Sequence, residues 1–362
     1  MTMSTAHTDR RIRVLIADDS AVMRSALSRL LTSDSAIEIA GIAKDGLSAV
    51  QQVAALDPDV VTLDLEMPVM NGLEALERIM RDRPRPVIMF SSLTVEGAEA
   101  TFDALALGAF DYVPKPTHGP FSATQVRDEL IAKVKAAYAS RIRKLGASER
   151  VSPLTEPTSA ARITQAPSYV SLICLGSSTG GPAALQRILP VLPGDFPVPM
   201  VIVQHMPVGF TGPFARRLDG LCQLRVQEAS QGQPFEPGTV SIAPAGWQLT
   251  VCRRGSRLAA NLSKEPAGML HMPSVDVMML SAAETCGSHA VGVIMTGMGS
   301  DGEKGMRALH FRGALTIGQD ERSCAVYGMP RACAEQGTLH RILPLEEIPR
   351  ELLRAVSVSM AR

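Results

Sequence analysis

Five polar residues in the first third of the chain each lie at the end of a short apolar run. They are Asp18 and Asp19 after IRVLIA, Asp64 within DVVTLDL, Ser91 within PVIMFSS, and Lys115 shortly after AFDYV. Three carboxylates in one place would repel one another unless a divalent cation lay among them, and Mg²⁺ prefers such hard oxygen ligands. One carboxylate could then accept a phosphoryl group whose oxygens the cation, the ammonium group and the hydroxyl group stabilise.

Helix capping is the alternative role for these carboxylates. An Asp at the end of a strand is a common N-cap for the helix that follows, and for any single Asp we regard capping as the more frequent role. Five residues of suitable types at the ends of four apolar runs favour a phosphoryl-accepting site instead.

Three glycine-flanked segments in the second half of the chain carry a hydroxyl group, an imidazole and a carboxylate. Ser178 lies within G-x-S-x-G after the apolar run YVSLICL, a spacing typical of a nucleophile on a sharp strand-to-helix turn. A Gly/Ser turn of this kind can also serve only as a helix cap or a phosphate cradle. His205 directly follows PMVIVQ, and Asp301 lies in the loop after HAVGVIMT. Together the three residues supply a nucleophile, a general base and a carboxylate that orients the base.

The third of these segments also supports a rival hypothesis, a dinucleotide site. Gly297, Gly299 and Gly302 form G-x-G-x-x-G, and Asp320 follows the next apolar run, near the spacing expected of a ribose-binding carboxylate. This hypothesis leaves the serine and the histidine unexplained. The fingerprint also usually opens a nucleotide-binding domain, whereas here it falls late in the second half of the chain.

The first 140 residues alternate short apolar runs with amphipathic stretches. Strands are expected at residues 12–17, 37–43, 59–65, 86–92 and 109–113, and helices at 21–31, 47–55, 72–80, 95–107 and 123–139. Near-continuously apolar strands that alternate with helices predict a parallel sheet covered on both faces. Such sheets bind ligands beyond the carboxyl ends of their strands, where the five polar residues are expected to lie.

The alternating pattern stops over residues 141–168, where Ser, Thr, Pro and charged residues follow one another without a sustained period, as in a linker. A strand-like run at 169–175 begins a second α/β region that continues to the C-terminus. We therefore expect one domain over 1–140, a linker over 141–168 and a second domain over 169–362. Both domains are expected to be doubly wound parallel-sheet folds.

Composition excludes several classes of protein. The 362 residues suit two domains, and 46% hydrophobic with 20% charged residues is typical of globular proteins. The net charge is −5 over 1–140 and +5 over 141–362. Neither part of the chain has the dense basic patch that nucleic-acid binding needs.

The six cysteines form no C-x-x-C pair and the seven histidines form no H-E-x-x-H pair, so neither a disulfide framework nor a transition-metal site is expected. The absence of a signal pattern or an apolar span indicates a cytoplasmic protein.

Residues 11–139 resemble a two-component receiver domain, a flavodoxin-like fold, through the motifs IADDS, TLDLEMP, FSS and PKP. The roles that this resemblance implies are phosphorylation for Asp64, Mg²⁺ binding for Asp18, Asp19 and Asp64, phosphoryl contacts for Ser91 and Lys115, and a switch aromatic at Tyr112. Glu66 follows the phosphoacceptor by two positions, where it is expected to influence the lifetime of the phosphoryl group.

Residues 169–355 closely resemble the catalytic domain of the CheB family of chemotaxis methylesterases, a Rossmann-like α/β fold. The resemblance lies in GSSTGG, VQHMPVGFTGPFARRL, HMPSVDVMM, TGMGSDG and TIGQDERSCAVYGMPRA. The order serine, histidine, aspartate also differs from that of α/β-hydrolases, in which the acid precedes the histidine. Several long motifs in the right order favour this family strongly over the dinucleotide hypothesis.

The resemblance implies a protein-glutamate methylesterase that also deamidates glutamine. Ser178 would attack the γ-methyl ester, His205 would act as base and then acid, and Asp301 would hold its tautomer. The backbone N–H of Met298 would donate to the oxyanion, and Thr179 would shape the turn. No cofactor is expected for this ester chemistry. Met272 stands where many relatives have a basic or small residue, a difference that touches none of these roles.

The implied partners are methyl-accepting chemoreceptors as substrates, with peripheral association with these membrane receptors, and a CheA-type histidine kinase as phosphodonor. The receiver would restrain the esterase until Asp64 is phosphorylated. A different hypothesis makes the second domain a binding module with an inactive hydrolase fold, and the complete set of Ser178, His205 and Asp301 argues against it.

Overall fold

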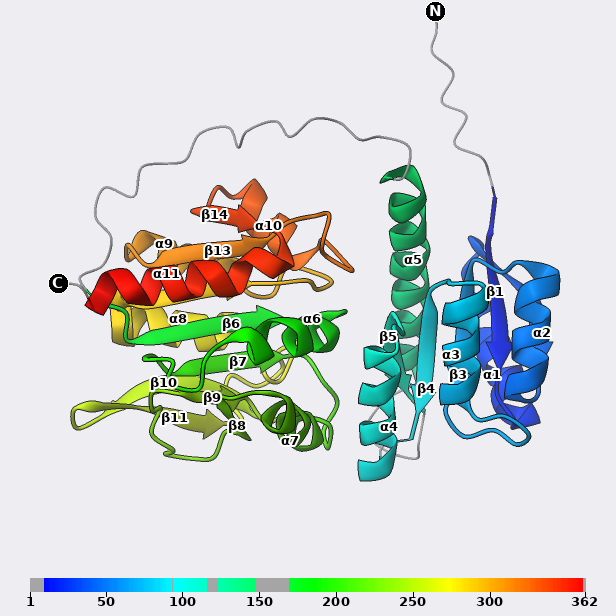
Figure 1. Ribbon diagram of the computed structural model, residues 1–362, viewed down its shortest axis with the longest axis horizontal. Coiled ribbons are helices and arrows are strands. Elements are labelled where there is room, and N and C mark those ends of the chain that lie inside the picture. The colour runs from blue at the N-terminus through cyan, green and yellow to red at the C-terminus, as the bar shows by residue number, and fades with distance from the viewer. Residues whose placement is uncertain (1–9, 93, 116–122, 148–168, 361–362) are drawn as a thin grey trace, which may run out of the picture. The chain divides into compact units, whose positions relative to one another are not determined.

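The computed structural model describes residues 10–92, 94–115, 123–147 and 169–360, which form two compact units (Figure 1). Each unit is built on its own parallel β-sheet, with five strands in the first and seven in the second. The predicted fold class, two α/β domains with parallel sheets, is therefore confirmed. Among the described residues, no helix is long and apolar enough to cross a membrane.

The N-terminal sheet and its connecting helices, which we call the first unit, alternate strands and helices along the chain. Its elements are β1 (Ile12–Ala17), α1 (Ala21–Thr32), β2 (Ile37–Ala43), α2 (Gly46–Leu56), β3 (Val60–Asp64), α3 (Gly72–Asp82), β4 (Val87–Ser91), α4 (Val95–Ala106), β5 (Asp111–Pro114) and α5 (Ala123–Ala147). The strand order is β2-β1-β3-β4-β5, with every neighbouring pair parallel. This is the doubly wound order of flavodoxin-like folds, whose ligands bind beyond the carboxyl ends of the strands.

Register brings the polar residues of the first unit to one edge of the sheet. Ala17 at the end of β1 pairs with Leu63 of β3, and Ser91 at the end of β4 pairs with Pro114 of β5. The strands are buried because apolar side chains of α1 and α5, such as Leu27 and Leu130, form one core with the strand residues on that face. Burial on both faces fixes the register, since a shift of one residue would move every side chain to the other face.

The last helix of the first unit is longer than the sequence pattern suggests. The expected helix ended at residue 139, whereas α5 continues to Ala147. The first residues of the expected linker, 141–147, are therefore helical, and residues 148–168 lie outside the described part of the chain.

The second unit contains the larger sheet and a separate two-stranded hairpin. Its elements are β6 (Leu172–Ser177), α6 (Gly181–Ile188), η1 (Leu189–Val191), β7 (Met200–Gln204), α7 (Thr211–Leu221), β8 (Arg225–Glu228), β9 (Thr239–Ile242), β10 (Gln248–Arg254), β11 (Arg257–Ser263), α8 (Val275–Cys286), η2 (Gly287–His289), β12 (Ala290–Ile294), α9 (Glu303–Phe311), β13 (Leu315–Gln319), α10 (Met329–Glu335), β14 (Arg341–Leu343), η3 (Leu345–Glu347) and α11 (Ile348–Met360). Figure 1 shows α6, α7 and α11 on the near face of the sheet and α8 and α9 behind it.

The strand order of the second sheet is β14-β13-β12-β6-β7-β9-β8. On one side of β6 lie β12, β13 and β14 in chain order, and on the other side lie β7, β9 and the edge strand β8, so the order reverses at β6. Ligands of open parallel sheets bind at such a switch point, beyond the carboxyl ends of the strands. The three strands that meet at this point, β12, β6 and β7, are the strands that precede Asp301, Ser178 and His205.

Candidate active site and phosphoacceptor site

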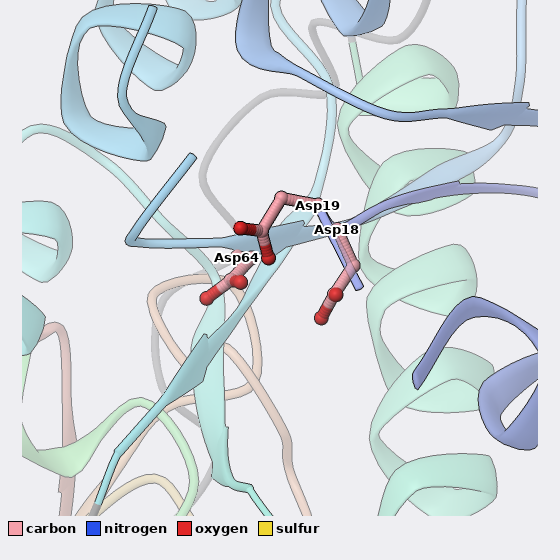
Figure 2. A group of neighbouring side chains, drawn as sticks. All are labelled: Asp18, Asp19 and Asp64. Carbon is pink, nitrogen blue, oxygen red and sulfur yellow. The ribbon is translucent and has the colours of Figure 1, made fainter. Parts of the chain in front are cut away.

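Three carboxylates of the first unit gather at the ends of β1 and β3. One oxygen from each of Asp18, Asp19 and Asp64 lies within 4.8 Å of the other two. Figure 2 shows the three side chains converging on one place. The expected acidic cluster is thus present.

Asp64 is buried, with 1% of its side chain exposed, and it pairs with Lys115, whose Nζ lies 2.6 Å from Oδ2. Burial raises the pKa of Asp64 above its ordinary value, although the hydrogen bond and the positive charge of Lys115 oppose this effect. The other oxygen of Asp64 accepts a hydrogen bond from the backbone N–H of Glu66 at 3.4 Å.

Asp18 has only one of its two oxygens satisfied. Its Oδ1 accepts the backbone N–H of Ser20 at 2.8 Å, whereas Oδ2 is buried without a hydrogen-bond partner among the described residues. Burial, and then the negative charge of Asp64, raise the pKa of Asp18 to about 6. A buried oxygen without a donor beside two further carboxylates fits a divalent cation, because a cation would satisfy the oxygen and remove the repulsion.

Ser91 and Tyr112 lie on the strands that complete this edge. Ser91 is fully buried at the end of β4, where its hydroxyl group donates to the carbonyl oxygen of Ser92 at 3.1 Å. Tyr112 is buried in β5, and the ammonium nitrogen of Lys133 lies 5.2 Å from the centre of its ring. Lys133 also pairs with Glu129 at 2.7 Å, so α5 supplies the cation beside this ring.

In the second unit, Ser178 lies on a tight turn between β6 and α6. Its backbone N–H donates to the carbonyl oxygen of Thr296 at 3.0 Å, and its own carbonyl accepts the N–H of Gly181 at 2.8 Å. A Cβ atom at Gly181 would lie 2.0 Å from Oε1 of Gln204, so only glycine fits there. The turn therefore holds the half-buried Ser178 at the carboxyl edge of the sheet.

His205 and Asp301 form a buried pair at the same edge. Nε2 of His205 lies 2.8 Å from Oδ2 of Asp301, and each side chain is 9% exposed. The other ring nitrogen of His205, Nδ1, is buried and makes no hydrogen bond within the described part of the chain. Nδ1 is therefore the nitrogen that can act as a base, while Nε2 carries the proton shared with Asp301.

Asp301 is held at the N-terminus of α8 by three further donors. Its Oδ1 accepts the hydroxyl group of Ser274 at 2.8 Å and the N–H of Asp276 at 3.0 Å, and its Oδ2 accepts the N–H of Val275 at 2.7 Å. Burial alone would raise the pKa of Asp301, but the hydrogen bond from His205 and these backbone donors outweigh it and hold the pKa well below its ordinary value. The carboxylate thus remains charged and fixed in position.

Gln204 connects the serine turn to the histidine strand. Its Nε2 donates to the carbonyl oxygens of both Ser178 and His205 at 3.0 Å, and its Oε1 accepts the hydroxyl group of Ser177 at 2.6 Å. Gln204 was not among the site residues predicted from the sequence. The available signal was a buried polar residue at the end of an apolar strand, directly before His205.

His271 is a second residue of this site that was not predicted from the sequence. Its ring stacks on that of His205, with centroids 3.9 Å apart and planes inclined by 11°. Its carbonyl oxygen accepts the side-chain amide of the fully buried Gln248 at 3.0 Å. The loop that carries His271 is therefore tied to the imidazole of His205.

The glycine-rich loop after β12 lies directly against the serine. A Cβ atom at Gly297 would come within 2.9 Å of Cβ of Ser178, so this glycine permits close approach of the loop. The hydroxyl group of Thr296 donates to the carbonyl oxygen of Thr179 at 2.9 Å. Met298 follows in this loop and is half-buried.

The dinucleotide hypothesis is not supported by these contacts. Gly297 lets its loop pack closely against Ser178. The carboxylate of Asp320 accepts hydrogen bonds from the backbone N–H and the hydroxyl group of Ser323, at 3.0 and 2.5 Å. The carboxylate expected to bind a ribose thus closes a local turn instead.

Comparison with known proteins identifies both units. Residues 173–352 match the family described as CheB methylesterase, and residues 14–123 match the response regulator receiver domain. A protein-glutamate methylesterase/protein-glutamine glutaminase of Desulfitobacterium hafniense is 42% identical, with 95% of this chain and 97% of that protein covered. One of the same name in Pyrococcus abyssi is 42% identical, with 97% and 95% covered. The second unit is similar to the crystal structure of the Thermotoga maritima CheB methylesterase catalytic domain, with a TM-score of 0.51 and 41% sequence identity. The match covers 52% of this chain and 99% of the Thermotoga chain.

Proposed function

The chain belongs to the CheB methylesterase family, and from this premise we propose that Ser178, His205 and Asp301 carry out its chemistry. It is a protein-glutamate methylesterase and protein-glutamine glutaminase, and its receiver domain makes it a phosphorylation-regulated enzyme of chemotactic adaptation. The contact between His205 and Asp301 at 2.8 Å, beside the turn that carries the half-buried Ser178, carries the proposal.

In the first half of the reaction, the hydroxyl oxygen of Ser178 attacks the γ-carbonyl carbon of the glutamate methyl ester. Nδ1 of His205 accepts the hydroxyl proton, and Asp301 stabilises the imidazolium that forms. When the tetrahedral intermediate collapses, the ester C–O bond breaks and the imidazolium gives its proton to the leaving methoxide. Methanol departs, and the acyl group remains on Ser178.

The second half uses a water molecule in place of the serine hydroxyl group. Nδ1 of His205 accepts a proton from the water as its oxygen attacks the acyl carbon, and the proton then returns to the oxygen of Ser178. The products are free glutamate and free enzyme. A glutamine substrate follows the same course with ammonia as the leaving group.

The developing oxyanion needs donors that do not move during the reaction. We assign the backbone N–H of Met298 to this role, because the preceding Gly297 lies against Ser178. Thr179 shapes the turn through its carbonyl contact with Thr296. The ester chemistry requires no cofactor beyond these groups.

The receiver half takes its phosphoryl group on Asp64, and Lys115 and Ser91 contact the phosphoryl oxygens. Asp18, Asp19 and Asp64 would hold the receiver-site metal, which we propose to be Mg²⁺ because all three ligands are carboxylates. When bound, Mg²⁺ would neutralise the developing negative charge. Tyr112 is the proposed switch aromatic. Without the phosphoryl group, the receiver restrains the esterase.

The partners follow from these activities. The substrates are methyl-accepting chemoreceptors, and the phosphodonor is a histidine kinase, which we propose to be of the CheA type. The enzyme would work in the cytoplasm and associate peripherally with the membrane receptors.

A covalent probe tests the nucleophile directly. A fluorophosphonate ester should label the wild-type chain at Ser178, and Ser178→Ala should abolish labelling. Ser177→Ala is the matched control, because the neighbouring Ser177 is buried and donates to Gln204. Labelling that persists in Ser178→Ala would show that another residue is the nucleophile.

Control by the receiver is tested with two changes. Asp64→Asn should remove activation by phosphodonor, and deletion of residues 1–140 should raise esterase activity. If the deletion left the activity unchanged or lower, the inhibitory role of the receiver would be wrong.

A further inference from the structure

Three loops of the second unit are joined to one another beside His205. They are the loop after β7, the loop between β9 and β10, and the loop between β11 and α8. The N–H of Gly246 donates to the carbonyl oxygen of Met272 at 2.9 Å, which links the second loop to the third. The ammonium nitrogen of Lys264 lies 3.9 Å from the centre of the Trp247 ring and contacts the carbonyl oxygen of Gly246. These contacts join the second and third loops, and the N–H of Ala245 in the second loop donates to Oγ1 of Thr211, at the end of the first loop, at 3.1 Å.

Several large apolar side chains, of types that are usually buried in a protein core, are exposed on this surface. We call the set the apolar rim, and its members are Val208 at 64% exposure, Trp247 at 41%, Met269 at 41% and Leu270 at 91%. A Cβ atom at Gly246 would lie 3.1 Å from Cγ2 of Val208, so the valine lies close against the second loop. Clustered apolar side chains of this kind mark interaction sites.

We propose that the apolar rim binds the stretch of substrate polypeptide that carries the modified glutamate. The inference rests on the proposed function, because it places the rim beside the nucleophile Ser178. The occupant is an amphipathic segment that presents apolar side chains next to the glutamyl ester.

The short glutamate side chain requires contact between the substrate backbone and this part of the enzyme. Only two methylene groups separate the Cα atom from the γ-carbonyl carbon that Ser178 attacks. The polypeptide on either side of the ester therefore has to lie over the loops that surround the serine and His205. The rim is continuous with the surface that the substrate protein must cover.

The third loop connects the rim to the catalytic imidazole. His271 stacks on His205 at 3.9 Å, and the residue immediately before it, Leu270, is almost fully exposed. The fully buried Gln248 holds the carbonyl oxygen of His271 at 3.0 Å, which fixes the loop in this position. Substrate that covers Leu270 is thus brought beside the histidine that activates the nucleophile.

The test compares a protein substrate with a small one in the full-length chain. The variant Val208→Ser/Leu270→Ser changes two exposed side chains, and kcat/KM is measured for methyl-esterified receptor membranes and for p-nitrophenyl acetate. We expect the ratio of the first value to the second to fall about tenfold or more, mainly through the KM for receptor, since burial of a Leu or Val side chain is worth at least that factor.

Phe311→Ser is the matched control. Phe311 is 79% exposed, but it ends α9, which leads back from the carboxyl edge to the start of β13. Its substitution should leave the ratio as in the wild type. An unchanged ratio in the rim variant, or an equal fall in the Phe311 variant, would overturn the inference. If Ser178→Ala still hydrolysed both substrates, the proposed function would fail instead.

Discussion

Asp301 pairs with Nε2 of His205, at 2.8 Å from its Oδ2. The other ring nitrogen, Nδ1, makes no hydrogen bond within the described residues and is left as the nitrogen that can accept a proton. The N-terminus of α8 holds this carboxylate through the N–H groups of Val275 and Asp276. The orientation of the His205 ring thus depends on a helix that follows the His271 loop in the chain, as well as on the strand that precedes His205.

Asp301→Asn should reduce kcat by about 10³–10⁴-fold with little change in KM. The neutral amide can donate to Nε2, which would place the imidazole proton on Nδ1 and remove the base. Steady-state ester hydrolysis checks this expectation.

Asp276→Asn is the control for that change. The Asp276 side chain accepts the N–H groups of Gly302 and Gly305 through Oδ1, an arrangement that an amide oxygen preserves. A similar loss of kcat in both variants would mean that Asp301 has no special role in orienting His205.

Gln204→Leu should lower both stability and kcat. The change leaves the carbonyl oxygens of Ser178 and His205 without their shared donor, at a cost of about 2 kcal/mol in the free energy of unfolding. We expect kcat to fall by about 10–100-fold, because loss of supporting hydrogen bonds misplaces the reacting groups.

Denaturant titration and ester kinetics measure these two effects. Gln186→Leu is the control, since Gln186 is half-buried and accepts a hydrogen bond from Arg217 away from the serine turn. Wild-type kcat in Gln204→Leu would contradict the positioning role.

Asp18→Asn should stabilise the receiver at pH 8 in the absence of metal. The folded-state pKa of Asp18 is raised from its ordinary value of 3.8 to about 6. The stability linked to this group is therefore fully present below pH 4 and is lost as the pH rises through 6. Removal of the charge should raise the midpoint of thermal unfolding by a few degrees, on the order expected for 1 kcal/mol.

Magnesium should stabilise the wild type much more than the Asp18→Asn variant. Mg²⁺ should raise the unfolding midpoint of the wild type at pH 8, because it binds only the folded cluster, and should have much less effect on Asp18→Asn. Asp34→Asn is the control, because the half-buried Asp34 pairs with Lys135 and the hydrogen bond from Lys135 lowers the pKa of Asp34. A wild-type response to Mg²⁺ in Asp18→Asn would contradict the metal-binding role.

The acidic cluster of the first unit was predictable because each of its three carboxylates follows from a local pattern, an apolar run that ends at an Asp. β1 and β2 have the predicted bounds, and the parallel sheet then brings Asp18 and Asp64 to the same edge. The end of α5 was not predictable in the same way. Residues 141–147 are rich in Arg and Lys and lack a sustained apolar pattern. Their sequence therefore resembled that of a linker, although the helix α5 continues through them.

The esterase site was predictable only in part, for a physical reason. Strand ends indicated where Ser178 and His205 lie, but the stacking of His271 depends on a loop 66 residues further along the chain. The contact of the Gln204 amide with the carbonyl oxygen of Ser178 likewise becomes visible only when β6 and β7 are adjacent. Contacts between distant segments leave no periodic pattern in the sequence.

Methanol release from methyl-esterified receptor membranes tests the central claim most directly. The wild-type chain, phosphorylated at Asp64, should release methanol, and Ser178→Ala should reduce the rate to that of membranes alone. The Ser178→Ala chain should still accept the phosphoryl group on Asp64, which shows that it is folded. Equal methanol release by the wild type and Ser178→Ala would contradict the account.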